Sequence, residues 1–444
     1  MPQFHHRRCS FVRNAVLFAG IAWGAMLPAQ AAGWRQGECG RFTVAVIPDT
    51  QNYTDFTHQK AEGFPLDAAP MFFEQMRYIA DNARSQGGDI VFATHMGDVW
   101  QHYSQWMDPG HEQRGFKWMP NAAGSAVARQ PYPQVRSFEI PTAIKAFELL
   151  AGKLPFSVVP GNHDYDALWT DPQHAPQPGA EDKGVSIRHI GGLTGYLSAF
   201  SNQSPLFKGQ PWYVASNDEG ADSAQVFNAG KCQLLHIGLQ FDPPDSSLAW
   251  ARRVIKRFPG IPTLVTVHKY LDRDGRRADT PALDLSVLDR RDNNPQMVWD
   301  EFISQHDQVF MVLSGHIGGQ GYSVDHNDDG HEVHQMLADY QGRSRVARQA
   351  AGSQDKGLST GDGWLRLLDF DLDSARPTVK VRTYSTHYRK HSTEFAGYAD
   401  AYKKAEGQQA LSDEAFATRD AFTIELGDFA HRFGHAAGTD ADRR

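Results

Sequence analysis

Residues 156–164 read FSVVPGNHD, an apolar run that ends at a Pro-Gly pair and is followed by Asn162, His163 and Asp164. A short apolar run bounded by Pro and Gly predicts a buried β-strand, which places the three polar residues in the loop at its carboxyl end. Their side chains offer an amide oxygen, an imidazole and a carboxylate, the groups that metal sites and acid–base chemistry use. This stretch therefore predicts a strand that carries reactive groups to one edge of a sheet.

Four other strand-like runs end in residues that could bind a metal. They are Asp49-Thr50-Gln51, His95-Met96-Gly97-Asp98, Val267-His268 and Ser314-Gly315-His316. Each cluster alone has an ordinary explanation, because Asp at a strand end often caps a helix and a single His is more often structural than a ligand. Five clusters at the same position favour one shared site, since the carboxyl ends of strands in an α/β sheet meet at one edge.

The rest of the chain predicts the architecture around that edge. From Arg41 onwards, strand-like runs alternate with helical patterns such as residues 70–86, which argues for a largely parallel sheet with helices outside it. The final third reads instead as strands joined by turns. We therefore predict an α/β protein with a two-sheet β-sandwich core flanked by helices, in one domain over residues 39–433. Residues 100–132 and 165–195 are predicted to be irregular insertions.

The two ends of the chain predict segments outside this domain. A basic start, an apolar run over residues 16–27 and the small residues Ala29-Gln30-Ala31 form the pattern of a cleavable signal peptide, residues 1–31. The apolar run is short for a membrane span. We expect a periplasmic or secreted protein without stable membrane association, and Arg7-Arg8 leaves the general and twin-arginine export routes open. Residues 434–444 predict a disordered tail.

Composition and cysteine content are compatible with an exported globular protein. The chain has 41% hydrophobic and 22% charged residues and a net charge of −8, so no nucleic-acid partner is expected and an anionic ligand would need local cations. Cys39 and Cys232 each precede an apolar run, which could put both at the same end of a sheet. Export would permit a disulfide between them, and two unrelated thiols are equally compatible with the sequence.

Taken in order, the motifs resemble those of the calcineurin-like metallophosphoesterases. The pattern of that family runs Asp-x-His, Gly-Asp, Gly-Asn-His-Asp/Glu, a single His and Gly-His-x-His. The matching residues here are Gly97-Asp98, Gly161-Asn162-His163-Asp164, His268 and Gly315-His316. The resemblance spans about residues 42–316 and implies hydrolysis of a phosphomonoester or phosphodiester by metal-activated water, without a covalent phosphoenzyme. It leaves the substrate open among nucleotides, phosphoproteins, sugar phosphates and phospholipid head groups.

The resemblance also implies a role for each matched residue. The metal ligands would be Asp49, Gln51, Asp98, Asn162, His268 and His316. Asp98 would bridge two divalent ions about 3.5–4 Å apart, and a mixed nitrogen and oxygen ligand set suits Mn, Fe, Zn or Ni rather than Ca. His163 would steady the phosphoryl oxygens or protonate the leaving group, and Asp164 would orient its imidazole through a hydrogen bond.

Two positions depart from the family pattern, and both belong to the same metal position. Gln51 stands where a His is expected, and Gly318 stands where the second His of the last motif is expected. A subfamily with a different first-metal shell, a one-metal enzyme and a decayed site are all compatible with this loss, and the intact second position favours the first. The alternative function is a non-catalytic or one-metal relative that serves as an exported binding protein. His95, His102 and His334 could each fill the gap, although each is more often an ordinary histidine.

Three further signals have two interpretations each. Residues 325–330 resemble the start of a calcium loop, but Met336 occupies position twelve, and Asp-Gly between alternating runs favours a hairpin turn. Aromatic residues of the first insertion could line a pocket or anchor the loop: Trp100, Tyr103, Trp106 and Trp118. Three arginines could meet a phosphate, although nothing singles them out: Arg291, Arg343 and Arg345.

Overall fold

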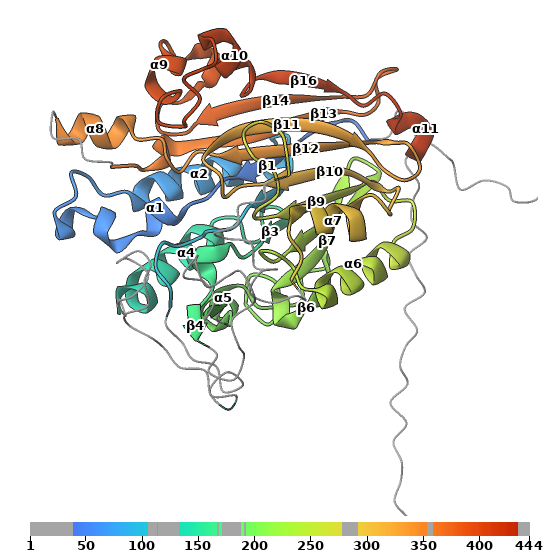
Figure 1. Ribbon diagram of the computed structural model, residues 1–444, viewed down its shortest axis with the longest axis horizontal. Helices are drawn as coiled ribbons and strands as arrows, with labels where there is room; N and C mark the ends of the chain where they lie inside the picture. Colours follow the sequence, from blue (N-terminus) through green and yellow to red (C-terminus); the bar gives the residue numbers. More distant parts are fainter. Residues whose placement is uncertain are drawn as a thin grey trace, which may run out of the picture.

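The computed structural model describes residues 39–104, 113, 133–166, 168–170, 188–190, 192–277, 292–352 and 358–433. The predicted signal peptide and tail lie outside the described residues, as do Trp106, Trp118 and Arg291. Two seven-stranded sheets face each other and carry helices on their outer sides (Figure 1). The predicted α/β, two-sheet sandwich flanked by helices is therefore confirmed.

The first sheet has the order β15-β14-β13-β1-β2-β3, with β16 also paired to β14. Its strands are β1 Arg41–Ile47, β2 Ile90–His95, β3 Phe156–Val158, β13 Trp364–Asp371, β14 Thr378–Ser385, β15 Lys390–His391 and β16 Phe422–Glu425. The strands β1, β2 and β3 run parallel, whereas β13 and β14 add antiparallel. Helices α2 (Ala69–Asp81), α4 (Ile140–Glu148) and α5 (Thr194–Phe200) share one apolar cluster with β1, β2 and β3.

The second sheet has the order β11-β12-β10-β9-β8-β7-β6. Its strands are β6 Tyr213–Asn217, β7 Asp222–Ala229, β8 Cys232–Leu239, β9 Thr263–Val267, β10 Val309–Ser314, β11 Gly319–His326 and β12 Glu332–Asp339. The strands β8, β9, β10 and β12 are parallel. Helices α6 (Asp245–Arg257) and α7 (Pro295–Val298) pack on its outer face, with α6 at the lower right of Figure 1.

The remaining elements are short. They are α1 Gln51–Thr54, α8 Arg345–Ala351, α9 Tyr398–Tyr402, α10 Asp413–Thr418, α11 Phe429–Phe433 and the hairpin of β4 Leu168–Thr170 with β5 Arg188–Ile190. The sequence patterns did not predict α9 and α10, which lie over the β14 side of the first sheet (Figure 1). The expected turn at residues 327–330 does join β11 to β12 as a hairpin. No helix among the described residues is long and apolar enough to cross a bilayer.

The core between the sheets is apolar and carries a covalent link. Phe92 of β2 stacks on Phe227 of β7 at 4.4 Å between ring centroids, and both rings are almost fully buried. Cys39 and Cys232 form a disulfide with their Cα atoms 4.9 Å apart. The bond therefore joins the start of β1 in the first sheet to the start of β8 in the second.

Candidate metal centre

The predicted site residues follow the carboxyl ends of five parallel strands and meet at one edge of the sandwich. Asp49 follows β1, Asp98 follows β2, and Asn162 opens a short 3-10 helix after β3. His268 and His316 follow β9 and β10 of the other sheet. Because the strands enter from both sheets, the five loops form a single centre where the two sheets meet.

One half of this centre has the geometry of a metal site with two histidines. Nε2 of His268 lies 3.3 Å from Oδ1 of Asp98, 3.2 Å from Oδ1 of Asn162 and 3.2 Å from Nδ1 of His316. The ligand atoms of Asp98, His268 and His316 all lie within 4.8 Å of one another. Ligands bonded at about 2.0–2.2 Å to a single ion have separations of this size. The residues therefore fit one divalent metal ion.

The protonation states in this half are set by burial and by the contact between Asp98 and His268. Burial would lower the pKa of His268, but Asp98 outweighs it and raises that pKa above its usual range. Burial and the neighbouring His268 lower the pKa of His316 to about 3, so its ring is neutral at pH 7. Burial alone would raise the pKa of Asp98, but His268, His163 and His316 outweigh it and hold that pKa below its usual range. His268 donates from Nδ1 to the carbonyl oxygen of Met96 at 2.7 Å, which leaves Nε2 as the ligand atom.

Glycines let the loops approach this closely. A Cβ on Gly161 would lie 2.2 Å from Oδ1 of Asp98, and one on Gly315 would lie 2.1 Å from Oδ1 of Asp49. The side chains of Asp98 and His316 are presented by backbone with positive φ, at 52° and 71°. Such conformations cost about 1–3 kcal/mol each in non-glycine residues and cluster at functional sites. The Gly-Asp, Gly-Asn-His-Asp and Gly-His motifs thus have a steric reason for their glycines.

The other half of the centre is lined by oxygen atoms. Asp49 and Gln51 are both 2% exposed, and the Asp49 carboxylate accepts the backbone N–H of His316 at 3.1 Å. Gln51 donates from Nε2 to Oδ2 of Asp98 at 3.3 Å, while its Oε1 is buried with no hydrogen-bond partner among the described residues. A buried oxygen left in this state costs about 1–3 kcal/mol unless a cation or donor meets it.

Two residues that the sequence motifs did not identify, Asp339 and Gln341, complete this half. Asp339 is the last residue of β12 and is fully buried, and Gln341 follows two residues later. Burial and the negative charges of Asp339 and Asp98 raise the pKa of Asp49 well above its usual range. The sequence does contain a signal that could have identified these two residues. The Asp-x-Gln pattern of Asp49-Thr50-Gln51 recurs in Asp339-Tyr340-Gln341, also at the end of a strand-like run.

His163 lies beside the ligands with its ring partly exposed. Its backbone N–H donates to Oδ1 of Asp98 at 2.9 Å, and its Nε2 lies 4.0 Å from Oδ2 of the same residue. Its Nδ1 donates to the carbonyl oxygen of Gln101 at 2.5 Å, and its ring stacks on Tyr103 with centroids 6.1 Å apart. The ring is therefore oriented by a backbone carbonyl and an aromatic neighbour.

The expectation that Asp164 orients the His163 ring is wrong. The Asp164 carboxylate is fully buried and accepts the backbone N–H groups of Val99 at 2.9 Å and Gly161 at 2.8 Å. These bonds use the oxygens that would have contacted the imidazole. Asp164 therefore holds the loop after β3 against the loop after β2.

The other candidate residues have separate partners. Each of the three spare histidines contacts groups outside the ligand cluster: His95 contacts Thr50, His102 contacts Glu139, and His334 contacts Tyr322. Trp100 is fully buried against Tyr196 and Phe200, so it anchors its loop. No atom of a described residue lies within 4 Å of a Cβ built at Gly318. None of the three histidines replaces the two expected ones.

The arginines proposed for phosphate binding also have other partners. Arg343 is fully buried, with its guanidinium paired to Glu406 at 2.6 Å and Asp420 at 3.0 Å. It is surrounded by four aromatic rings, those of Tyr340, Trp364, Tyr398 and Tyr402. The Arg345 guanidinium lies over the ring of Phe395 at 4.9 Å. Arg343 is therefore a core residue and is not available to a substrate.

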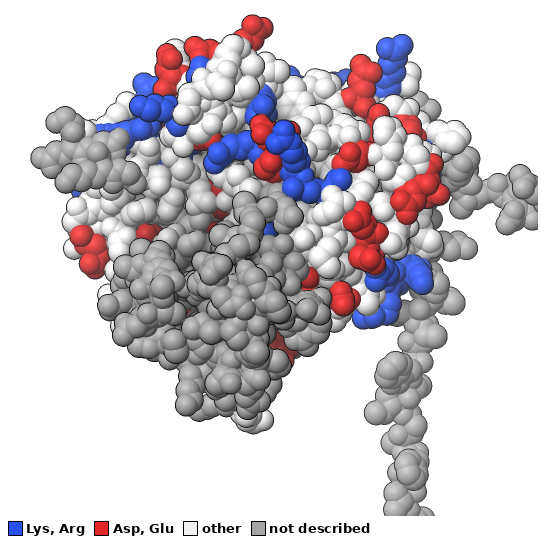
Figure 2. Space-filling view, viewed as in Figure 1, with Lys and Arg blue, Asp and Glu red and all other residues white. Residues whose placement is uncertain are grey.

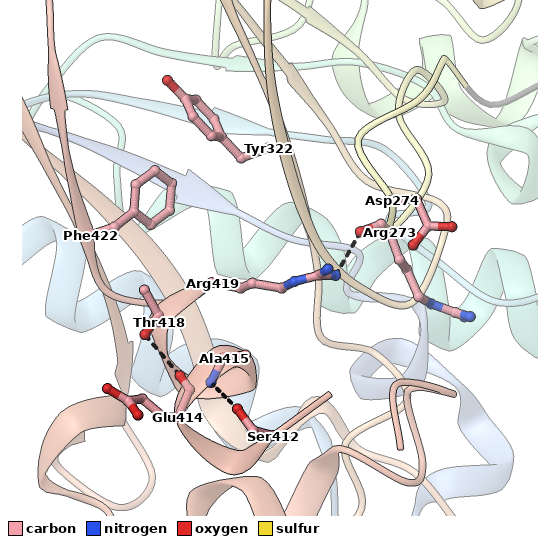
Figure 3. Close-up of a pocket in the computed structure, with 9 residues that line it drawn as sticks. All are labelled: Arg273, Asp274, Tyr322, Ser412, Glu414, Ala415, Thr418, Arg419 and Phe422. Atoms are coloured by element: carbon pink, nitrogen blue, oxygen red, sulfur yellow. Dashed lines mark hydrogen bonds between the residues drawn. The ribbon is translucent and has the colours of Figure 1, made fainter. Parts of the chain in front are cut away.

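A cavity of about 620 Å³ lies among residues of β11, α10 and β16 and the segment 273–274 (Figure 3). Its lining residues are Arg273, Asp274, Tyr322, Ser412, Glu414, Ala415, Thr418, Arg419 and Phe422. Arg273 donates from Nε to the carbonyl oxygen of Gly318, and Arg419 donates to the carbonyl oxygen of Arg273 at 2.7 Å. On the face shown in Figure 2, acidic and basic side chains are interspersed over the described part of the surface.

Comparison with known proteins adds one relative. No protein-family model matches the chain. Over 356 residues it is 26% identical to "Uncharacterized protein YvnB" of Bacillus subtilis (strain 168), a region that covers 78% of this chain. The chain spans 20% of the length of that relative. The name of that relative states no activity.

Proposed function

We propose that this protein hydrolyses phosphoesters with water activated by divalent metal ions. The observation that carries the proposal is the convergence of Asp98, His268 and His316 within 4.8 Å, with Oδ1 of Asn162 at 3.2 Å from the same His268 nitrogen. Two imidazoles, a carboxylate and an amide oxygen suit Mn, Fe, Zn or Ni. Such an ion, when bound, polarises a phosphoryl oxygen and lowers the pKa of a bound water.

The residues around the metal position have complementary tasks. The two oxygens of Asp98 face different halves of the centre, Oδ1 toward His268 and Oδ2 toward Gln51, which suits a bridging carboxylate. Because a carbonyl oxygen can only accept, the bond to Gln101 fixes the proton of neutral His163 on Nδ1. Its Nε2 can then hold a second proton, donate it to a phosphoryl oxygen or pass it to the leaving group.

The proposal extends to the setting in which the enzyme works. The signal-like pattern of residues 1–31 and the Cys39–Cys232 disulfide support export to the periplasm or the outside of the cell, because disulfides persist in oxidising compartments. The substrate is a phosphomonoester or phosphodiester. Its class beyond that is set by the loops around the centre.

The test is turnover of p-nitrophenyl phosphate and bis-p-nitrophenyl phosphate by the purified mature protein, after addition of Mn²⁺, Zn²⁺ or Fe²⁺. We expect hydrolysis of at least one ester, removed by chelation and by Asp98→Ala. If neither ester turns over with any metal although an ion is bound, the chain is a non-catalytic binding protein. Which ester reacts separates a phosphomonoesterase from a phosphodiesterase.

A further inference from the structure

We infer that Asp55, His102 and Glu139 form a separate metal site that holds one divalent cation such as Zn²⁺. None of the three belongs to the ligand set proposed for hydrolysis, so the inference does not rest on that function. All three residues are at most 5% exposed, which leaves no access for a substrate. The ion would therefore be structural.

Three segments that are distant in the chain bring these side chains together. Asp55 directly follows α1, His102 lies in the loop after β2, and Glu139 ends a π-helical turn, Val135–Glu139, that leads into α4. Oε1 of Glu139 accepts the backbone N–H of Phe56 at 3.2 Å, and its Oε2 accepts that of His102 at 3.1 Å. The Glu139 carboxylate is therefore held between the other two segments before any ion binds.

The ligand atoms have the spacing of a metal site. Nδ1 of His102 lies 2.7 Å from Oε1 of Glu139 and 4.0 Å from Oδ1 of Asp55, and the ligand atoms of all three residues lie within 4.8 Å of one another. Two ligands bonded at about 2.0–2.2 Å to one ion can be up to about 4.4 Å apart. Among the described residues, only one other group of His, Cys, Asp and Glu side chains has this spacing, and it is the cluster of the candidate metal centre.

A hydrogen bond alone accounts for only part of this arrangement. A proton on Nδ1 of His102 can be directed at Oε1 of Glu139. Oδ1 of Asp55 lies 4.0 Å from the same nitrogen, which is beyond hydrogen-bonding distance. One N–H group serves one of the two carboxylates, whereas an ion bound to Nδ1 would contact both.

The charges of the cluster favour a cation. Asp55 and Glu139 are buried, and within the described part of the chain no lysine or arginine pairs with either carboxylate. Their ionisable neighbours are the rings of His102 and His58, and Nε2 of His58 lies 3.7 Å from Oδ2 of Asp55. Buried carboxylates need a compensating positive charge. A divalent ion would supply it to both, and protonation of the two rings is the alternative that the experiment tests.

The ligand types define the cation, and the position of the ligands defines its effect. One imidazole and two carboxylates suit Zn²⁺, Mn²⁺ or Fe²⁺. Asp55 lies shortly after Gln51 in the chain, and His102 lies shortly after Asp98. The ion would therefore link the loops after β1 and β2, which carry candidate ligands of the other centre.

The experiment counts Zn²⁺ on the mature full-length protein, stripped by chelation, reloaded with Zn²⁺ and freed of unbound ions. By elemental analysis, Asp55→Asn and His102→Asn should each bind one Zn²⁺ fewer per chain than the wild type, and calorimetry should show the affinity for that ion weakened at least tenfold. Asn at position 55 keeps an oxygen for the backbone N–H of Thr57, and Asn at position 102 keeps a donor for Glu139. His334→Gln, at another buried histidine, is the control and should bind as many ions as the wild type.

A second measurement separates this ion from the candidate metal centre. In His268→Ala, which removes a ligand of that centre, one Zn²⁺ should remain, with a single imidazole bound to it by X-ray absorption, and adding Asp55→Asn should remove it. Equal zinc content and affinity in the wild type, Asp55→Asn and His102→Asn would overturn the inference in favour of protonated rings, as would a folded His268→Ala without zinc. The wild-type comparison stands even if His268→Ala does not fold. Neither count depends on ester turnover, so a protein without phosphoesterase activity can still carry this ion.

Discussion

Nδ1 of His163 lies 2.5 Å from the carbonyl oxygen of Gln101, so the backbone after β2 orients the ring that faces the metal position. The loop that supplies this carbonyl also supplies Asp98. A shift of that loop would therefore move a metal ligand and the candidate acid together. The position of the His163 ring therefore depends on the loop after β2 as well as on the loop after β3 that carries His163.

The role of His163 is testable through the leaving group. His163→Asn should lower kcat about 10²–10⁴-fold on an alkyl phosphate, where the leaving oxygen needs a proton. On p-nitrophenyl phosphate the loss should be smaller, because that leaving group departs without one. Equal losses on both esters, measured at saturating metal, would assign His163 to phosphoryl binding rather than to proton transfer.

Asp164 should behave as a structural residue. Asp164→Asn weakens its bonds to the amides of Val99 and Gly161, so we expect about 1–3 kcal/mol lower stability and less than a tenfold fall in kcat. Urea denaturation and steady-state kinetics on the same preparation measure both. A large kcat loss with unchanged stability would restore the orienting role.

Arg343 should matter for folding. Arg343→Met leaves Glu406 and Asp420 without this buried partner, and removing one member of a buried ion pair costs about 3–5 kcal/mol. Arg345→Met, whose guanidinium lies over a single aromatic ring, is the matched control and should cost less than about 1 kcal/mol. Thermal unfolding distinguishes the two, and a change in KM without loss of stability in Arg343→Met would contradict the assignment.

His236 should make stability depend on pH. Burial lowers the pKa of His236 to about 3, whereas the unfolded chain titrates near 6.5. Below pH 6.5 the unfolded state binds the extra proton, so stability falls toward pH 3 by up to about 1.4 kcal/mol per pH unit. In His236→Gln the slope of the unfolding free energy against pH should fall by the contribution of one proton. Urea denaturation between pH 4 and 7 would detect this change. An unchanged slope would mean that other groups dominate.

The disulfide should contribute to stability without affecting the metal. The double variant Cys39→Ser, Cys232→Ser opens a loop with a sequence separation of 193 and should lose about 5 kcal/mol in the chain-entropy model. Denaturation with and without reductant gives the same comparison in the wild type. Metal content should not change, and a parallel loss of ions would contradict this independence.

The sequence predicted the part of the candidate metal centre that consists of short motifs at the ends of parallel strands. Asp98, Asn162, His268 and His316 converge because the ends of such strands share one edge. Asp339 was missed because residues 332–339 lie in a region that reads as hairpins, whereas β12 pairs parallel to β10 as well as antiparallel to β11. The sequence also could not predict that the carbonyl oxygen of Gln101 contacts the His163 ring. It depends on where the backbone of a loop far away in the chain comes to lie.

The Cys39–Cys232 bond joins the segment just before β1 to the first residue of β8, while the candidate metal ligands follow the last residues of strands in the same two sheets. The sandwich is thus linked covalently at one rim and carries the candidate metal ligands at the opposite rim. Neither feature obstructs the other, so oxidation and metal uptake can occur in either order. If the chain is exported as proposed, its disulfide can form first and the proposed metal ion can bind afterwards.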